Sequence, residues 1–143
     1  YQEMDPDLPP LDPASSLYIF NGLLVGTFAP TASRTSFCGR SPLTGIWNES
    51  NVGHHWGAEL RFAGYDGIVI TGASQTPVYL YISGIEGDVE FRDASHLWGQ
   101  DWFETGDALL EETDAKAQVA GIGAAGENLV KMAGIMVGPS HYV

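Results

Sequence analysis

The fold and the candidate site are decided by residues 26–57, which read GTFAPTASRTSFCGRSPLTGIWNESNVGHHWG. Clusters of Gly, Ser, Thr, Asn and Pro mark tight turns, so this stretch cannot form one long helix or strand. No Asp or Glu occurs from position 13 to position 48, yet Arg34 and Arg40 both lie there, in a chain whose net charge is −12. A guanidinium group binds phosphate or carboxylate through a planar fork of donors, and Gly-rich turns form concave anion sites. We interpret residues 26–57 as a cradle for a phosphorylated cofactor; the alternative is a pair of ordinary surface salt bridges.

The length of 143 residues and the hydrophobic content of 44% indicate one globular domain spanning residues 1–143. The chain lacks an initiator Met and stops in the middle of a pattern, so we expect a fragment that is truncated at both ends. Asp and Glu number 18 against 6 Lys and Arg, which argues against nucleic-acid binding because that depends on cationic side chains. We see neither a signal peptide nor an apolar run of membrane length, and we expect no membrane association.

Cys38 is the only cysteine. A disulfide framework and a Cys-only metal or iron–sulfur site within this chain are therefore excluded, and a reducing cytoplasm is the expected location. Arg40 could lower the pKa of the Cys38 thiol, but no second cysteine or base accompanies it, so we interpret Cys38 as a packing residue. His54 and His55 lack further ligands at a convincing spacing; we expect one to line a cavity near the cradle. The catalytic residues stay unknown.

The order of the predicted elements favours an α+β fold with mostly antiparallel sheets and a few short helices. Residues 17–22 and 67–72 are predicted as strands, the second of them central because it is β-branched and bounded by glycines. Residues 77–84 and 88–93 alternate around a Gly-bearing turn and predict a hairpin. Short helices are predicted near residues 56–64 and from Asp101 onward, where Glu104 completes a capping-box pattern. Residues 117–123 and 128–138 are predicted as further strands.

The segment GIGAAG, residues 121–126, matches GxGxxG and invites a dinucleotide-binding interpretation. That interpretation requires an acidic residue about 20 positions on to hold the ribose, and no acidic residue occurs from position 128 to position 143. The segment also lacks room for the helix and second strand of a βαβ unit. We therefore predict a tight turn between strands.

Five ordered blocks carry a resemblance to a known family. They are APTASR (29–34), SPLTG (41–45), SNVGHHWGAELRFAGYDGIVITG (50–72), RDASHLWG (92–99) and IGAAGENLVKMAGIM (122–136). In this order they resemble the N-terminal domain of the aldehyde ferredoxin oxidoreductase family, the tungsten-pterin enzymes. The resemblance covers nearly the whole chain, and it implies a β-rich base domain on which a cofactor sits.

The resemblance also implies an activity and a set of cofactors and partners. Members of this family hold one tungsten, or sometimes molybdenum, through two pterin cofactors, with a [4Fe–4S] cluster beside the metal. They oxidise aldehydes to carboxylic acids with ferredoxin as the electron acceptor. The cluster ligands and most pterin-binding motifs lie in later domains, so we expect downstream domains of the same polypeptide as partners, and a homodimer is left open. Those domains would cover apolar residues that we expect to be exposed here, such as Trp47, Trp56 and Met136.

Three residues match the family's cofactor-binding positions. The resemblance implies that Arg34 binds a pterin phosphate and that Asn51 offers its backbone carbonyl to a magnesium ion bridging the pterin phosphates. It implies that Gly53 lets the backbone approach the cofactor closely. A helix beginning just after this glycine would also direct its N-terminal dipole towards an anion near Asn51.

The chain departs from the family pattern beside these positions. Ala32 and Ser33 stand where the family has a pair of glycines, and His54 stands where the family has the second glycine of its N-S-G-G run. The substrate is therefore open. The alternatives are a related aromatic acyl-CoA reductase of the same family, or a noncatalytic module that kept the fold without the cofactor.

Overall fold

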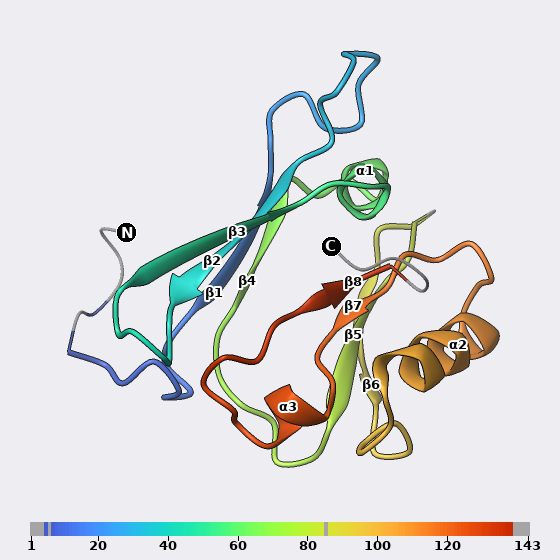
Figure 1. Ribbon diagram of the computed structural model, residues 1–143. Helices are drawn as coiled ribbons and strands as arrows, with labels where there is room; N and C mark the ends of the chain where they lie inside the picture. The colour runs from blue at the N-terminus through green and yellow to red at the C-terminus, as the bar shows by residue number, and fades with distance from the viewer. Residues whose placement is uncertain (1–4, 6, 85, 139–143) are drawn as a thin grey trace.

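The structure, a computed structural model, describes residues 5, 7–84 and 86–138 (Figure 1). Its first layer is a four-stranded sheet whose strand order is β3-β2-β1-β4. The strands are β1 (Leu17–Asn21), β2 (Thr35–Arg40), β3 (Trp47–Val52) and β4 (Gly67–Ile70). All three pairings in this sheet are antiparallel. The predicted α+β class with mostly antiparallel sheets is confirmed.

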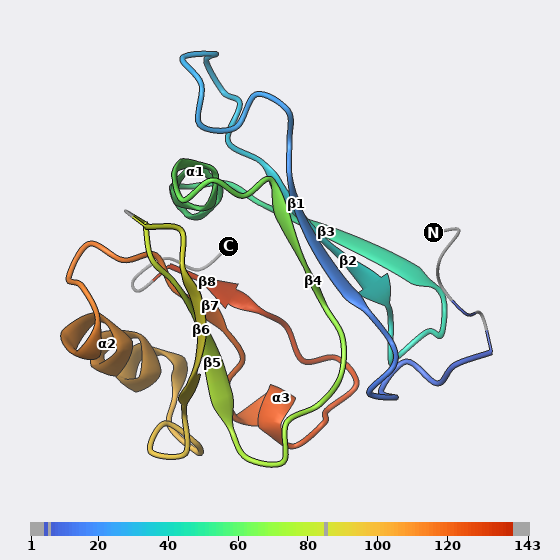
Figure 2. The same cartoon turned by 180° about the vertical axis from the view of Figure 1, so that it is seen from behind.

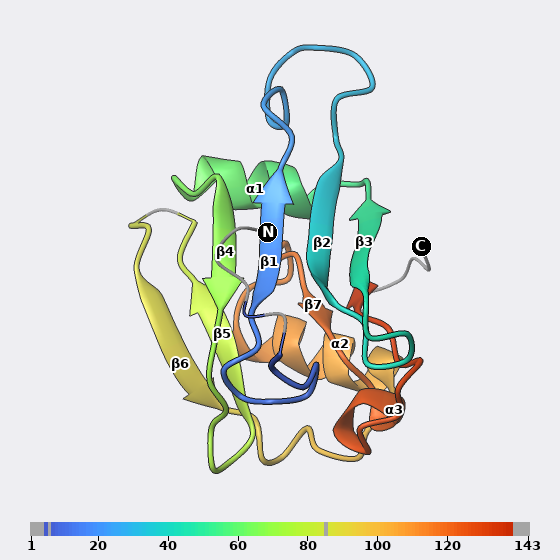
Figure 3. The same ribbon diagram turned by 90° about the vertical axis from the view of Figure 1, so that its left-hand side faces the viewer.

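The second layer consists of two antiparallel pairs and a helix. The pairs are β5 (Val78–Ile82) with β6 (Val89–Asp93), and β7 (Ala120–Gly121) with β8 (Met136–Val137). Helix α2 (Trp102–Glu112) packs beside them, and Figure 2 shows it on the far side of these pairs from the four-stranded sheet. In Figure 3 the four-stranded sheet faces the viewer and α2 lies behind it. The helices α1 (Trp56–Phe62) and α3 (Ala124–Glu127) are short.

Two apolar clusters form the core, and one of them joins the two layers. One contains Ile19, Phe37 and Val52 of the four-stranded sheet together with Val137 of β8. The other lies under α2 and contains Leu97, Trp102, Leu109 and Val119. Burial of each such side chain contributes about 1.5–3 kcal/mol, so the first cluster fixes the two layers against each other and the second holds α2 against its own layer.

Several predicted elements are confirmed, because their local signals are strong. Strand β1 lies within residues 17–22, and the hairpin of β5 and β6 lies within residues 77–93. At the start of α2 the Asp101 carboxylate accepts hydrogen bonds from the backbone N–H groups of Phe103 (2.8 Å) and Glu104 (2.9 Å). The Glu104 side chain returns to the Asp101 backbone N–H, which completes the predicted capping box.

Other expectations are wrong in ways that have physical causes. Strand β4 is an edge strand and not a central one, because among the described residues it pairs only with β1. A β-branched run bounded by glycines does not distinguish the two positions. Strand β3 was not predicted, since its residues 48–51 are polar and exposed and show no apolar alternation. The GIGAAG segment opens the one-turn helix α3 instead of forming a tight turn between strands. The two terminal strands are only two residues long each. Within the described residues, no helix has the length and apolar character needed to cross a membrane.

A buried polar contact joins the sheet to α1. Thr35 is fully buried, and its hydroxyl donates to the Asn21 side-chain oxygen at 2.7 Å. The Asn21 amide nitrogen donates in turn to the Gly57 carbonyl at 2.8 Å. A Cβ atom at Gly57 would lie 2.1 Å from the Thr35 hydroxyl oxygen, so only glycine fits at this point of α1. The contact therefore sets where α1 begins relative to β1 and β2.

Replacing Gly57 tests this contact. We expect Gly57→Ala to lower the free energy of unfolding by about 1–3 kcal/mol, because the added methyl group overlaps two hydrogen-bonded oxygens. Urea denaturation of the variant measures the loss. Gly134→Ala is the matched control, because a Cβ atom there would meet nothing within 4 Å. Equal stabilities of the two variants would contradict the proposed packing.

Candidate functional site

The three predicted cofactor-binding residues lie together at one end of the β2–β3 pair. The register places Ser36 opposite Asn51 and Thr35 opposite Val52, so Arg34 and Gly53 follow as the next pair along the chain. A Cβ atom built on Gly53 would lie 3.9 Å from the Arg34 Nη1 atom. Residues 17 to 19 positions apart in the sequence therefore form one local site.

The Arg34 side chain is exposed. Its guanidinium group makes no hydrogen bond or ion pair within the part of the chain that the structure describes. Arg34 bonds through its backbone instead, where its carbonyl accepts from the Gly22 N–H at 3.0 Å. Arg40 differs, because its guanidinium donates to the carbonyls of Gly45 and Leu8 and so joins the 41–45 turn to the N-terminal segment. Arg40 thus has a structural role, through backbone carbonyls, while the Arg34 side chain stays exposed.

Gly53 leaves space beside this guanidinium. A Cβ atom at this position would have the Ser33 hydroxyl oxygen as its nearest neighbour, at the ordinary van der Waals distance of 3.7 Å. The protein's own packing therefore does not require glycine at this position. The missing side chain instead leaves the half-buried Gly53 backbone uncovered next to Arg34. Ser33, which the sequence marked only as a departure from the family pattern, also lies beside Gly53.

The Asn51 side chain is engaged on the outer face of the sheet. Its Oδ1 atom lies 2.9 Å from the Ser36 hydroxyl, which is also 3.1 Å from a Glu49 carboxylate oxygen. The side chain is therefore held by neighbours, and the backbone carbonyl is the group left for a cation. Strand β3 is an edge strand, so alternate backbone groups along it point away from the sheet.

The residues after Gly53 adopt an unusual backbone. His54 has a φ of +74°, the left-handed region that β-carbon-bearing residues rarely occupy. His55 is the N-cap of α1 and makes no side-chain capping hydrogen bond. The two imidazole rings lie edge to face, 4.7 Å apart. A glycine would adopt the His54 conformation without strain, which explains the glycine of the family pattern at this position.

Cys38 lies on the outer face between β1 and β3. Burial of the side chain raises the pKa of the Cys38 thiol above its ordinary value, and the nearby Glu49 carboxylate raises it further. The expectation that Arg40 could lower this pKa is wrong. A raised pKa keeps the thiol neutral near pH 7 and unreactive, which agrees with the interpretation of Cys38 as a packing residue.

Much of the predicted cradle does not take part in this site. Residues 23–33 form a loop that projects beyond the sheet, the blue loop at the top of Figure 1. Its Leu23 and Phe28 side chains are 89% and 108% exposed. Only the base of the loop, at Ser33 and Arg34, reaches Gly53. The turn-rich composition of residues 26–57 could not separate the projecting loop from the residues that lie beside Gly53.

The remaining sequence expectations have mixed outcomes. His96 forms a hydrogen bond with a Glu112 carboxylate oxygen. Trp47, Trp56 and Met136 are half-buried and not exposed as expected. The exposed apolar side chains are mainly those of Leu23, Phe28, Phe91, Met132, Ile46 and Leu129. No three His, Cys, Asp or Glu side chains gather into a metal site within the described ranges.

Comparison with known proteins decides the family. The model of the aldehyde ferredoxin oxidoreductase N-terminal domain matches residues 1–143. This chain belongs to the aldehyde ferredoxin oxidoreductase family. The tungsten-containing aldehyde ferredoxin oxidoreductase of Pyrococcus furiosus is 48% identical over 136 residues, which are 94% of this chain and 22% of the relative. The enzyme of the same name from Thermococcus kodakarensis is 50% identical over 136 residues, again 94% of this chain and 22% of the relative.

A solved structure supports the same fold. It is described as the active site complex BamBC of benzoyl coenzyme A reductase in complex with 1,5-dienoyl-CoA. It is 42% identical to this family member with a TM-score of 0.91, over 96% of this chain and 21% of that chain. The present chain thus spans about a fifth of the length of the proteins that it matches.

The strained backbone at His54 yields a prediction about stability. A left-handed φ value costs a non-glycine residue roughly 1–2 kcal/mol. Glycine avoids this cost but destabilises the folded state by about 0.5–1 kcal/mol, because it loses more conformational entropy on folding. We expect His54→Gly to leave the free energy of unfolding unchanged or to raise it by up to about 1 kcal/mol. His54→Val, with a β-branched side chain, should lower it. Thermal melts of both variants measure the order, and a His54→Val protein more stable than His54→Gly would refute the strain.

Proposed function

We propose that this family member is the cofactor-binding N-terminal domain of a tungsten or molybdenum bis-pterin oxidoreductase that also contains an iron–sulfur cluster. The proposed reaction is the oxidation of aldehydes to carboxylic acids with ferredoxin as the electron acceptor. Its support is the family membership together with curated relatives at 46–50% identity that are named tungsten-containing aldehyde ferredoxin oxidoreductases. The whole enzyme would comprise this domain and later domains of the same polypeptide.

The observation that carries the proposal is the exposed Arg34 guanidinium beside the Gly53 backbone, which no side chain covers. Arg34 would donate charge-assisted hydrogen bonds to a pterin phosphate, in the bidentate geometry that guanidinium favours. Asn51 would offer its backbone carbonyl to magnesium, which takes hard oxygen ligands and is commonly shared with substrate phosphates. The bis-pterin metal, when bound, supplies the redox chemistry. The residues of this chain bind and orient it.

The proposed partners follow from the incomplete site. The single cysteine cannot ligate a [4Fe–4S] cluster, so the cluster ligands would come from outside residues 1–143. Ferredoxin would dock on the assembled enzyme, and the complete protein could also form a homodimer. The excess of 18 acidic over 6 basic residues argues against a nucleic-acid partner.

A second candidate function is the reduction of an aromatic acyl-coenzyme A thioester. The observation in its favour is the likeness to the benzoyl coenzyme A reductase complex at 42% identity and a TM-score of 0.91. A relative named aliphatic sulfonate oxidoreductase subunit, 36% identical, shows that substrates differ within this group. Assays of the complete enzyme with aldehydes and with aromatic acyl-coenzyme A thioesters would separate the candidates. A chain lacking tungsten, molybdenum and pterin would indicate a noncatalytic module.

Arg34 variants of the complete enzyme test the binding role. Each charge-assisted hydrogen bond contributes roughly 1.5–3 kcal/mol, so Arg34→Ala should weaken cofactor retention by roughly ten- to hundredfold per bond lost. Arg34→Lys should recover only part of it, because an ammonium group cannot reproduce the planar fork. Metal analysis and pterin fluorescence on purified protein measure occupancy.

Arg40 is the matched control within the same acid-free segment. Its guanidinium holds the carbonyls of Gly45 and Leu8, so Arg40→Ala should lower the melting temperature while occupancy stays close to that of the unaltered enzyme. Full cofactor occupancy in Arg34→Ala would refute the assignment of Arg34.

A further inference from the structure

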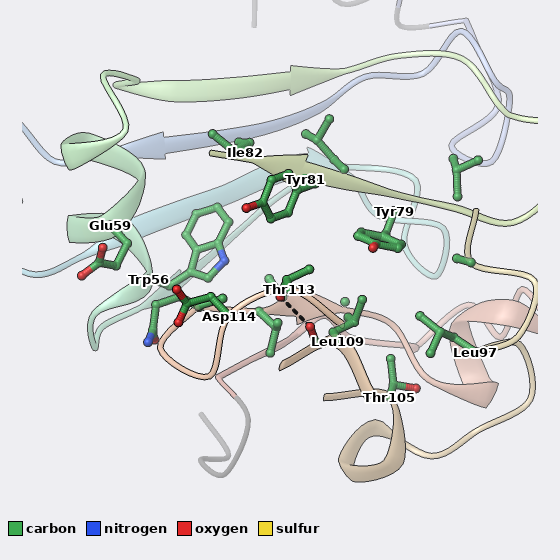
Figure 4. A pocket seen from close by; sticks show the side chains of 18 of the residues that line it. Trp56, Glu59, Tyr79, Tyr81, Ile82, Leu97, Thr105, Leu109, Thr113 and Asp114 are labelled. Atoms are coloured by element: carbon green, nitrogen blue, oxygen red, sulfur yellow. Dashed lines mark hydrogen bonds between the residues drawn. The ribbon is translucent and has the colours of Figure 1, made fainter. Parts of the chain in front are cut away.

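A cavity of about 640 Å³ lies between the two layers of the domain (Figure 4). Its volume corresponds to roughly 20 water molecules, far more than a packing defect. The walls come from α1, β5, α2 and β7, and they are largely apolar and aromatic. Trp56, Tyr81, Ile82 and Leu109 are among the side chains that line it in Figure 4. Charged residues such as Glu59 are exposed and lie towards one side.

Strand β5 borders this cavity with its edge and not only with a face. Side chains of a strand alternate between its two faces, so a cavity against one face would contact every second residue. All the residues from Val78 to Ile82 line the cavity. The sheet order agrees, because β6 is the only strand that pairs with β5 among the described residues.

The hydrogen-bond pattern shows which backbone groups of β5 face the cavity. At the two ends of the hairpin, the Ser83 N–H donates to Asp88 and the Ala94 N–H donates to Pro77, both at 2.9 Å. In an antiparallel pair, hydrogen-bonded and non-hydrogen-bonded positions alternate. Tyr79 and Tyr81 therefore bond to β6. The N–H and C=O groups of residues 78, 80 and 82 point away from β6, towards the free edge.

Strand β7 presents a second free edge to the same cavity. The Gly138 N–H donates to the Val119 carbonyl at 2.7 Å, so by the same alternation Ala120 directs its backbone groups away from β8. Residues 117–122 line the cavity in an unbroken run. The cavity is thus a gap between the free edges of two separate two-stranded pairs, which are at best marginally stable on their own.

We propose that an extended apolar segment following residue 143 in the complete polypeptide occupies this cavity as a β-strand. It would pair with the free edges of β5 and β7 and join the two pairs into one sheet. This inference rests on the proposed function only in taking the chain to be the N-terminal part of a longer family member. The match is to an N-terminal domain, and the chain covers 22% of its curated relatives, so most of their length lies beyond it.

The described residues end just after β8, which pairs with the strand β7 that borders the cavity. The Gly138 carbonyl accepts a hydrogen bond from the indole Nε1–H of Trp102 at 3.0 Å, and both Trp102 and Val119 line the cavity. A strand also fits the chemistry of the walls better than a small apolar ligand does. An apolar ligand would bury the free N–H and C=O groups without partners, whereas a strand satisfies them.

Amide hydrogen exchange on the complete protein tests the pairing. We expect the amides of Val78, Leu80 and Ile82 to exchange at least about tenfold more slowly than those of Val89 and Phe91, which occupy the outer edge of β6. Leu80 and Phe91 are register partners, so Leu80→Pro and Phe91→Pro form a matched pair. Leu80→Pro should abolish the protection at residues 78 and 82, while Phe91→Pro should leave it. Equal exchange at the two edges would overturn the proposal.

A photo-crosslinking amino acid at position 81 identifies the occupant, with the same probe at the exposed position 91 as control. We expect the probe at 81 to crosslink within one polypeptide to a peptide C-terminal to residue 143. A crosslink to an upstream peptide or to a second copy, or slow exchange only after a small apolar ligand is added, would overturn the proposal. These readouts do not depend on cofactor content, so failure here is distinguishable from failure of the proposed function.

Discussion

The buried contact of Thr35 with Asn21, and of Asn21 with Gly57, is the constraint on which the first layer depends. It joins the end of β1, the start of β2 and the first turn of α1 through two hydrogen bonds of 2.7 and 2.8 Å. An unpaired buried hydroxyl or amide is costly, so these three positions cannot shift independently. The candidate site lies next to this contact, because Arg34 precedes Thr35 and Gly53 follows Val52, the register partner of Thr35.

The candidate site lies at the ends of strands, and the strand register fixes the positions of its residues. Arg34 comes directly before β2 and Gly53 directly after β3, and the β2–β3 register sets them opposite each other. Apolar packing of Phe37 and Val52 fixes this register, because a slip by one residue would move both side chains out of the core. The hydrophobic core therefore positions a polar site that contributes nothing to the core itself. Two of the departures from the family, Ser33 and His54, directly precede Arg34 and follow Gly53, outside the paired residues of β2 and β3.

The second layer is organised differently. Its strands form two short pairs with free edges facing a cavity, and its stability comes largely from the cluster under α2. The domain thus combines a continuous four-stranded sheet that carries the candidate site with a layer of two separate strand pairs. In the proposed oxidoreductase, the rest of the polypeptide would supply the further cofactor and cluster ligands beside the four-stranded sheet. It would also supply the strand that pairs with β5 and β7 in the second layer.

The sequence by itself determined the family, the antiparallel α+β class, the hairpin of β5 and β6 and the capped helix α2, because each depends on neighbouring residues. Asp101 and Glu104 reveal a helix start from a spacing of three positions, and the ordered blocks identify the family without any geometry. Only the tertiary structure decided that β3 is a strand, since its polar residues are held by pairing with β2 and not by propensity. It also decided that the Arg40 guanidinium is engaged while that of Arg34 stays open to a ligand, although the sequence presents them alike. The fold places the carbonyls of Gly45 and Leu8 beside the Arg40 guanidinium and leaves the Arg34 side chain exposed.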